Sequence, residues 1–68
     1  MGSSRGLVAK RREKILKSLI ENKVVYTEQL AKELNVSEMT IRRDLQQFED
    51  QKLVERFYGG AKLIEDSL

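Results

Sequence analysis

The sequence predicts a mainly α-helical fold with a small β-hairpin or three-stranded sheet, arranged as a winged helix-turn-helix. Three observations lead to this fold class. Three segments carry apolar residues at helical spacing. The second and third of them are separated by only a short turn. Two β-prone runs then flank the pair Gly59-Gly60. Two short helices followed directly by a hairpin are typical of a winged helix-turn-helix.

The first helix is expected over about residues 8–21, followed by a short strand. Its apolar residues at helical spacing are Ile15, Leu16, Leu19 and Ile20. Residues 24–26, with the sequence VVY, are too few for a helix and rich in β-formers. They are therefore expected to supply the third strand of the sheet.

The second helix is expected over about residues 28–34, with Thr27 as its N-cap and Glu28 in its first turn. Its buried stripe should comprise Leu30, Ala31 and Leu34. The helix should end at Asn35-Val36, because asparagine tolerates the left-handed conformation that terminates helices.

Ser37 is a good N-cap for a third helix over about residues 38–51. Ile41, Leu45 and Phe48 lie at i, i+4 and i+7, so they should form its buried face. Asp44 lies at the edge of that face. It is better placed to brace a basic side chain than to meet a ligand.

The hairpin, LVERFYGGAKLI, is expected to form the wing over about residues 53–64, with its turn at Gly59-Gly60. Phe57 and Tyr58 are expected to pack on the sheet, with stacking on bases as the alternative. The domain as a whole should span residues 8–64. Residues 1–7 read as a disordered leader or a remnant left by cloning.

Composition excludes several classes of function. The chain has no Cys and no His, so it lacks thiolate metal ligands and the commonest general base. No metal, cofactor or enzymatic activity is predicted. No apolar run is long enough to span a membrane, and the apolar face of the first helix is needed for the core. The net charge is +5 through Lys23 and −3 from Val24 onward. A polyanion partner or a solvated basic helix would each account for this.

The exposed face of the third helix carries side chains suited to reading bases in a major groove. A helical wheel places these opposite the apolar stripe or beside that pole: Met39, Thr40, Arg43 and Gln46. Arginine can recognise guanine, glutamine can recognise adenine, and Thr or Met can touch a thymine methyl. Arg42 lies on the flank. The alternative is a solvated face in which Glu38 and Asp44 pair with the two arginines.

A second set of residues could hold DNA phosphates. They lie in the first helix, at or near the starts of the second and third helices, and in the wing. They are Lys10, Arg11, Arg12, Thr27, Ser37, Arg42, Arg56, Gly59, Gly60 and Lys62. Glycines permit positive φ and close backbone approach. Plain solvation of the first helix, and a simple hairpin turn in the wing, stay open as alternatives.

The run LAKELNVSEMTIRRDLQQFEDQKLVERFYGGA, together with RREKIL at Arg11–Leu16, resembles the N-terminal DNA-binding domain of the DeoR family of bacterial transcriptional regulators. The resemblance covers about residues 8–63 and implies that the helix-turn-helix lies at about residues 25–44. It implies sequence-specific binding to a double-stranded DNA operator, in the cytoplasm at the nucleoid, by a repressor of sugar or nucleoside metabolism. Tyr58 departs from the family, which often has a His there.

The resemblance also implies a longer protein. Residues 65–68 would begin a linker to a C-terminal domain that senses a sugar phosphate. The intact protein would be a homo-oligomer, whereas this domain alone would be a monomer that binds no sugar phosphate. The alternative function is a winged helix that docks a protein or RNA. The basic residues of the third helix favour DNA.

Overall fold

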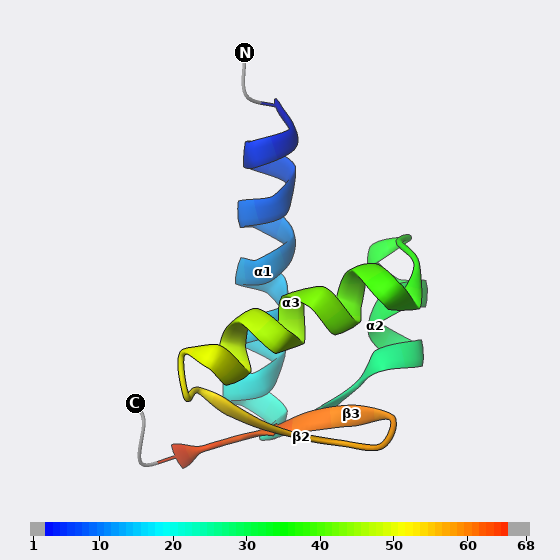
Figure 1. Ribbon diagram of the computed structural model, residues 1–68. Helices are drawn as coiled ribbons and strands as arrows, with labels where there is room; N and C mark the ends of the chain where they lie inside the picture. Colours follow the sequence, from blue (N-terminus) through cyan, green and yellow to red (C-terminus); the bar gives the residue numbers. More distant parts are fainter. Residues whose placement is uncertain (1–2, 66–68) are drawn as a thin grey trace.

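Three helices and a three-stranded sheet follow one another in the predicted order (Figure 1). The computed structural model describes residues 3–65. Its elements are α1 (Ser3–Asn22), β1 (Val24–Tyr26), α2 (Thr27–Leu34), α3 (Glu38–Asp50), β2 (Val54–Phe57) and β3 (Gly60–Leu63). The winged helix-turn-helix fold class is thus confirmed.

The first helix begins earlier than predicted. It starts at Ser3 rather than at about residue 8, since no proline interrupts the residues before Val8. Those first turns project beyond the other elements (Figure 1). Ile15 and Leu19 are completely buried, but Ile20 is 46% exposed and is not part of the core. Of the predicted leader and linker, residues 1–2 and 66–68 lie outside the described residues.

The hairpin strands and β1 form one antiparallel sheet in the order β1-β3-β2. The turn lies one residue earlier than predicted. Phe57 pairs with Gly60, so Tyr58 and Gly59 make the turn and Gly60 begins β3. Gly59 has φ +96°, which only glycine adopts readily. Gly60 serves close packing instead, because a Cβ there would lie 2.1 Å from the carbonyl oxygen of Val25.

The turn between α2 and α3 forms as predicted. Asn35 adopts the left-handed conformation, with φ 57° and ψ 48°. The Ser37 hydroxyl oxygen accepts a hydrogen bond of 3.1 Å from the Thr40 amide, which caps α3. The prediction that Thr27 caps α2 is wrong. Thr27 is the first helical residue and is buried, and its amide donates to the Gly59 carbonyl at 2.8 Å. The wing therefore fixes the start of α2.

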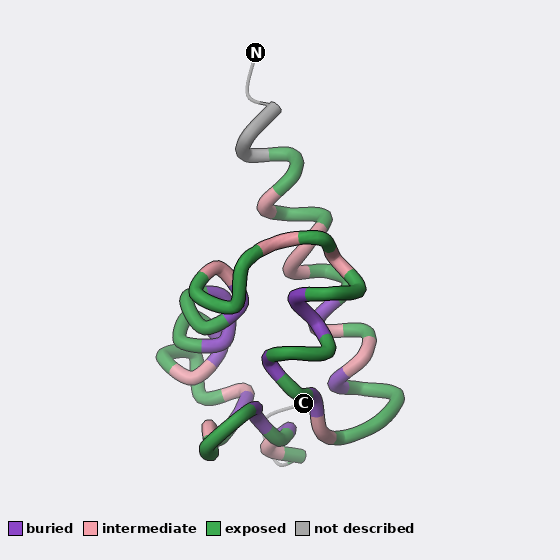
Figure 2. The backbone as a smooth tube through the Cα atoms, turned by 90° about the vertical axis from the view of Figure 1, so that its right-hand side faces the viewer, coloured by how far each residue is buried: buried purple, intermediate pink, exposed green. Residues whose placement is uncertain are grey.

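The core lies between the helices and the sheet. It contains Ile15, Leu19, Val25, Leu30, Ala31, Ile41, Leu45, Phe48, Val54, Ala61 and Leu63. Leu34, predicted to be core, is only half-buried. The burial pattern shows each helix turning one side inward and the other outward (Figure 2). Within residues 3–65, no helix has the length and apolar character needed to cross a membrane.

Candidate nucleic-acid interface

The outer face of α3 is accessible along its first turns, as the helical wheel predicts. Ile41 and Leu45 are fully buried on the opposite side. Met39 is 59% exposed, Arg43 and Gln46 are exposed, and only Thr40 is half-buried. The four predicted base-reading residues thus lie on the turns and the side of the helix that can enter a groove. Their contacts with bases stay a prediction.

The two adjacent arginines have different surroundings. Arg42 pairs with Glu38 one turn earlier, with 3.5 Å between the Arg42 Nη2 and Glu38 Oε1 atoms. Arg43 has no ion-pair partner within the described part of the chain, and its Nη2 lies 3.9 Å from the Met39 sulfur. The helix pair between Glu38 and Arg42 that the sequence allowed is therefore present. Arg43 remains available to a ligand.

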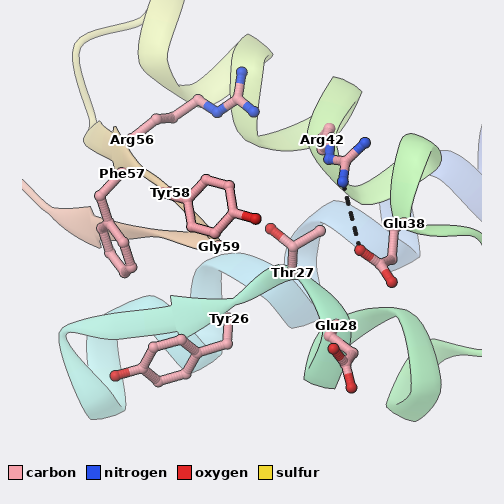
Figure 3. Close-up of a pocket in the computed structure, with 9 residues that line it drawn as sticks. All are labelled: Tyr26, Thr27, Glu28, Glu38, Arg42, Arg56, Phe57, Tyr58 and Gly59. Atoms are coloured by element: carbon pink, nitrogen blue, oxygen red, sulfur yellow. Dashed lines mark ion pairs between the residues drawn. The ribbon is translucent and has the colours of Figure 1, made fainter.

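A notch of about 490 Å³ separates the wing from the two helices of the helix-turn-helix. It is lined by Tyr26, Thr27, Glu28, Glu38, Arg42, Arg56, Phe57, Tyr58 and Gly59 (Figure 3). The side chains of Arg42 and Arg56 lie along α3 on one side of it (Figure 3). Two guanidinium groups that reach one opening from separate elements suit a phosphate, which arginine binds with a planar fork of donors.

One prediction about the aromatic residues of the wing is wrong. Tyr58 does not pack on the sheet, because its position in the turn leaves it fully exposed. Phe57 is 40% exposed and meets the ring of Tyr26 edge-on, with 6.1 Å between the centroids. Lys62 pairs across the hairpin with Glu55 at 3.4 Å. Tyr58 is therefore a wing-tip residue whose accessibility the sequence analysis missed.

Of the three residues of α1 predicted to contact phosphate, one is exposed and two bind a carboxylate of the protein. Lys10 is exposed. Arg11 and Arg12 both donate hydrogen bonds to Asp44, whose side chain is 1% exposed. The expectation that Asp44 braces a basic side chain is confirmed. The phosphate roles of Arg11 and Arg12 stay a prediction, and they would compete with this pairing.

Electrostatics keep the Asp44 carboxylate charged. Burial alone raises its pKa, but the hydrogen bonds and positive charges of Arg11 and Arg12 outweigh burial and hold the pKa below its usual value. The same contact raises the pKa of Arg11 above its ordinary value, because its hydrogen bond to Asp44 outweighs the opposing effect of burial. The Asp44 carboxylate and the Arg11 guanidinium are therefore both ionised at neutral pH.

Three predicted phosphate contacts have structural roles in this state. Ser37 caps α3, and its Oγ is also 3.0 Å from the Thr40 hydroxyl. Thr27 and Gly60 are buried. Their contacts with phosphate stay a prediction. Glu38 also lines the notch but was not predicted as a site residue, although its spacing of four residues from Arg42 was a signal that could have placed it there.

Comparisons with known proteins agree with this geometry. The family model for the DeoR-like helix-turn-helix domain matches residues 11–67. The lactose phosphotransferase system repressor of Staphylococcus epidermidis is 36% identical over 52 residues, which cover 76% of this chain and 21% of that protein. The HTH-type transcriptional regulator GlpR of Haloferax volcanii is 40% identical over 55 residues, covering 81% and 22%.

The glycerol-3-phosphate regulon repressor of Escherichia coli is 46% identical over 44 residues, covering 65% of this chain and 18% of that protein. The chain thus spans about a fifth of the length of the curated relatives it matches. These relatives are transcription regulators and not enzymes, which agrees with the expectation for this chain. No solved structure matches it.

Proposed function

We propose that the chain, which belongs to the family of DeoR-like helix-turn-helix domains, reads a specific sequence in double-stranded DNA as part of a transcriptional repressor. The observation that carries this proposal is the outer face of α3. Arg43 there is exposed and free of an ion pair among the described residues, on the side opposite the buried Ile41 and Leu45. A capped helix with such a face fits a major groove.

Arg42 and Arg43 would make different contacts with DNA. They are adjacent, so their side chains leave the helix about 100° apart and cannot both reach the groove floor. Arg43 would read a base, alongside Met39, Thr40 and Gln46. Arg42 lines the notch and would hold a phosphate instead. Arg56 and the wing backbone would contact the same DNA strand.

The names of the relatives suggest the wider setting. They include repressors of a lactose phosphotransferase system and of a glycerol-3-phosphate regulon. We therefore propose that the protein represses genes of sugar or nucleoside metabolism in the cytoplasm, at the nucleoid. It would act as a homo-oligomer, with a sugar phosphate bound outside this domain.

Alanine variants of the two arginines test the reading of DNA. A preferred duplex is first selected from a random pool, and a scrambled duplex of the same composition serves as its control. Arg43→Ala should cost about 1–3 kcal/mol on the preferred duplex and relax the preference at one base pair. Arg42→Ala should weaken binding to both duplexes alike. Fluorescence anisotropy measures the affinities.

Melting temperatures complete the experiment. Both arginines are exposed, so both variants should melt close to the wild type. If the random pool yields no preferred duplex, or if both variants bind both duplexes as the wild type does, the arginines are a solvated face and the proposal fails.

A further inference from the structure

A hydrogen bond joins the wing to a predicted base-reading residue. Arg56 of β2 donates from Nη1 to the Gln46 Oε1 of α3 at 2.8 Å. Gln46 in turn donates from Nε2 to the Asp50 Oδ1 at 3.0 Å. Both polar atoms of the Gln46 carboxamide are therefore occupied within the protein.

This occupancy conflicts with base reading. Glutamine recognises adenine through two hydrogen bonds, one from its amide nitrogen and one to its amide oxygen. Each atom keeps a second lone pair or N–H, but the two contacts fix the orientation of the carboxamide. The carboxamide becomes free to turn its edge toward a base when Arg56 moves to another acceptor and the exposed contact with Asp50 exchanges.

The Arg56 side chain leaves one of its hydrogen-bond donors without an acceptor. Its Nε atom is buried and is the one such nitrogen or oxygen among the side chains of residues 6–65 that has no hydrogen-bond partner. A buried donor without an acceptor is unfavourable. The main chain at this residue is held separately, by a hydrogen bond of 3.4 Å from its amide to the Glu49 Oε2. The guanidinium can therefore move while the strand stays in place.

The notch supplies the site for the alternative acceptor. Arg56 and Arg42 both line it (Figure 3). A phosphate entering there would accept hydrogen bonds from both guanidinium groups, and Arg56 could use its Nε together with an Nη in a bidentate contact. The anionic phosphate is a stronger acceptor for the Arg56 guanidinium than the neutral carboxamide of Gln46, although Glu28 and Glu38 also line the notch and Glu38 holds Arg42.

We propose that Arg56 is a latch that couples the phosphate contact of the wing to base reading by α3. In the free protein Arg56 holds Gln46. When a backbone phosphate enters the notch, Arg56 turns to the phosphate and the released Gln46 carboxamide reads a base. Gln46 is thus a specificity-determining residue only in the DNA-bound state. The inference rests on the proposed function.

A double-mutant cycle tests the latch in the 68-residue chain. Gln46→Met removes the carboxamide at similar volume, and Arg56→Met removes the guanidinium while keeping an apolar stem. In the wild type, Gln46→Met should reduce the affinity for the selected duplex. The expected loss is at most the roughly 5- to 150-fold that a bidentate base contact supplies. In the Arg56→Met background the loss should be larger, because no latch has to open.

A rival arrangement predicts the opposite sign. If Gln46 stays bound to Arg56 in the complex and only positions it, the effect of Gln46→Met disappears once Arg56 is replaced. That outcome overturns the latch. Lys62→Met is the matched control: it removes another wing cation, one that pairs with Glu55 and not with α3. The effect of Gln46→Met should be the same in that background as in the wild type.

A second readout makes the test independent of affinity. The side-chain amide NMR signal of Gln46 should shift in the free protein when Arg56 is replaced by Met or, if that variant is unfolded, by Lys. It should shift again when the selected duplex is added. An unchanged amide signal on DNA binding contradicts the latch. Absence of any preferred duplex contradicts the proposed function instead, so the two failures are distinguishable.

Discussion

Asp44 links α1 to the inner side of α3 through two arginines. Its carboxylate is buried with Arg11, while Arg12 covers it with a side chain that is 37% exposed. Buried ion pairs need not stabilise a fold more than apolar residues would. Removing the carboxylate is nevertheless costly, because Arg11 and Arg12 lose their charge-assisted hydrogen bonds in a partly buried site.

We expect Asp44→Asn to lower the free energy of unfolding by about 1–3 kcal/mol at pH 7, because it weakens charge-assisted hydrogen bonds to two arginines that solvent reaches in part. The pKa of Asp44 is lowered in the folded state, so its contribution is present above the unfolded pKa of about 3.9 and is lost as the pH falls through the folded value. The difference between the wild type and the variant should therefore shrink below about pH 4. Urea unfolding at several pH values measures it.

An exposed pair provides the control for Asp44. Glu38→Gln breaks the pair with Arg42, in which both side chains are about half exposed, and should cost at most about 1 kcal/mol. Equal losses for the two variants would show that the Asp44 cluster stabilises no more than a surface pair. A pH-independent difference would show that the charge of Asp44 is not the cause.

At the scale of the elements, the wing depends on its two glycines for different reasons. Gly59 needs its positive φ, but a Cβ added there would have no neighbouring atom within 4 Å. Gly60 lies in a strand, where an added Cβ would strike the Val25 carbonyl at 2.1 Å. Because that neighbour is backbone of β1, it cannot move aside without separating two strands.

Gly59→Ala should therefore cost about 1–2 kcal/mol, the usual penalty for a left-handed residue with a Cβ. Gly60→Ala should cost more, about 3 kcal/mol or above, because it overpacks the sheet. Thermal unfolding followed by circular dichroism measures both. A larger loss for Gly59→Ala would mean that β1 and β3 can separate easily, contrary to the observed register.

The elements also show which parts of the structure local sequence determines. Ser37 and the Thr40 amide are three residues apart, so the cap of α3 was predictable. The start of α2 depends on the Gly59 carbonyl, which is distant in the sequence, so the prediction for Thr27 was wrong. The face of α3 followed from helical periodicity. The contact of Gln46 with Arg56 joins two elements and could not be read from either one.

For the whole molecule, the distribution of charge governs how DNA binding responds to salt. The segment through Lys23 carries a net charge of +5, and the rest of the chain carries −3. Two of the basic residues in the first segment, Arg11 and Arg12, already pair with Asp44. A basic residue that keeps its pair with the buried Asp44 releases no counterions from DNA, whereas the exposed pairs of Arg42 and Lys62 can exchange their carboxylates for phosphates.

The salt dependence of binding therefore reports how the basic residues are used. If Lys10, Arg42, Arg56 and Lys62 contact phosphates, log K should fall against log salt with a slope of about −4, because each contact contributes about −0.9. If Arg11 and Arg12 leave Asp44 for phosphates as well, the slope should approach about −5. Anisotropy titrations of one duplex at several salt concentrations separate the two. A slope near zero would refute the electrostatic contribution altogether, since charged contacts with DNA always release counterions.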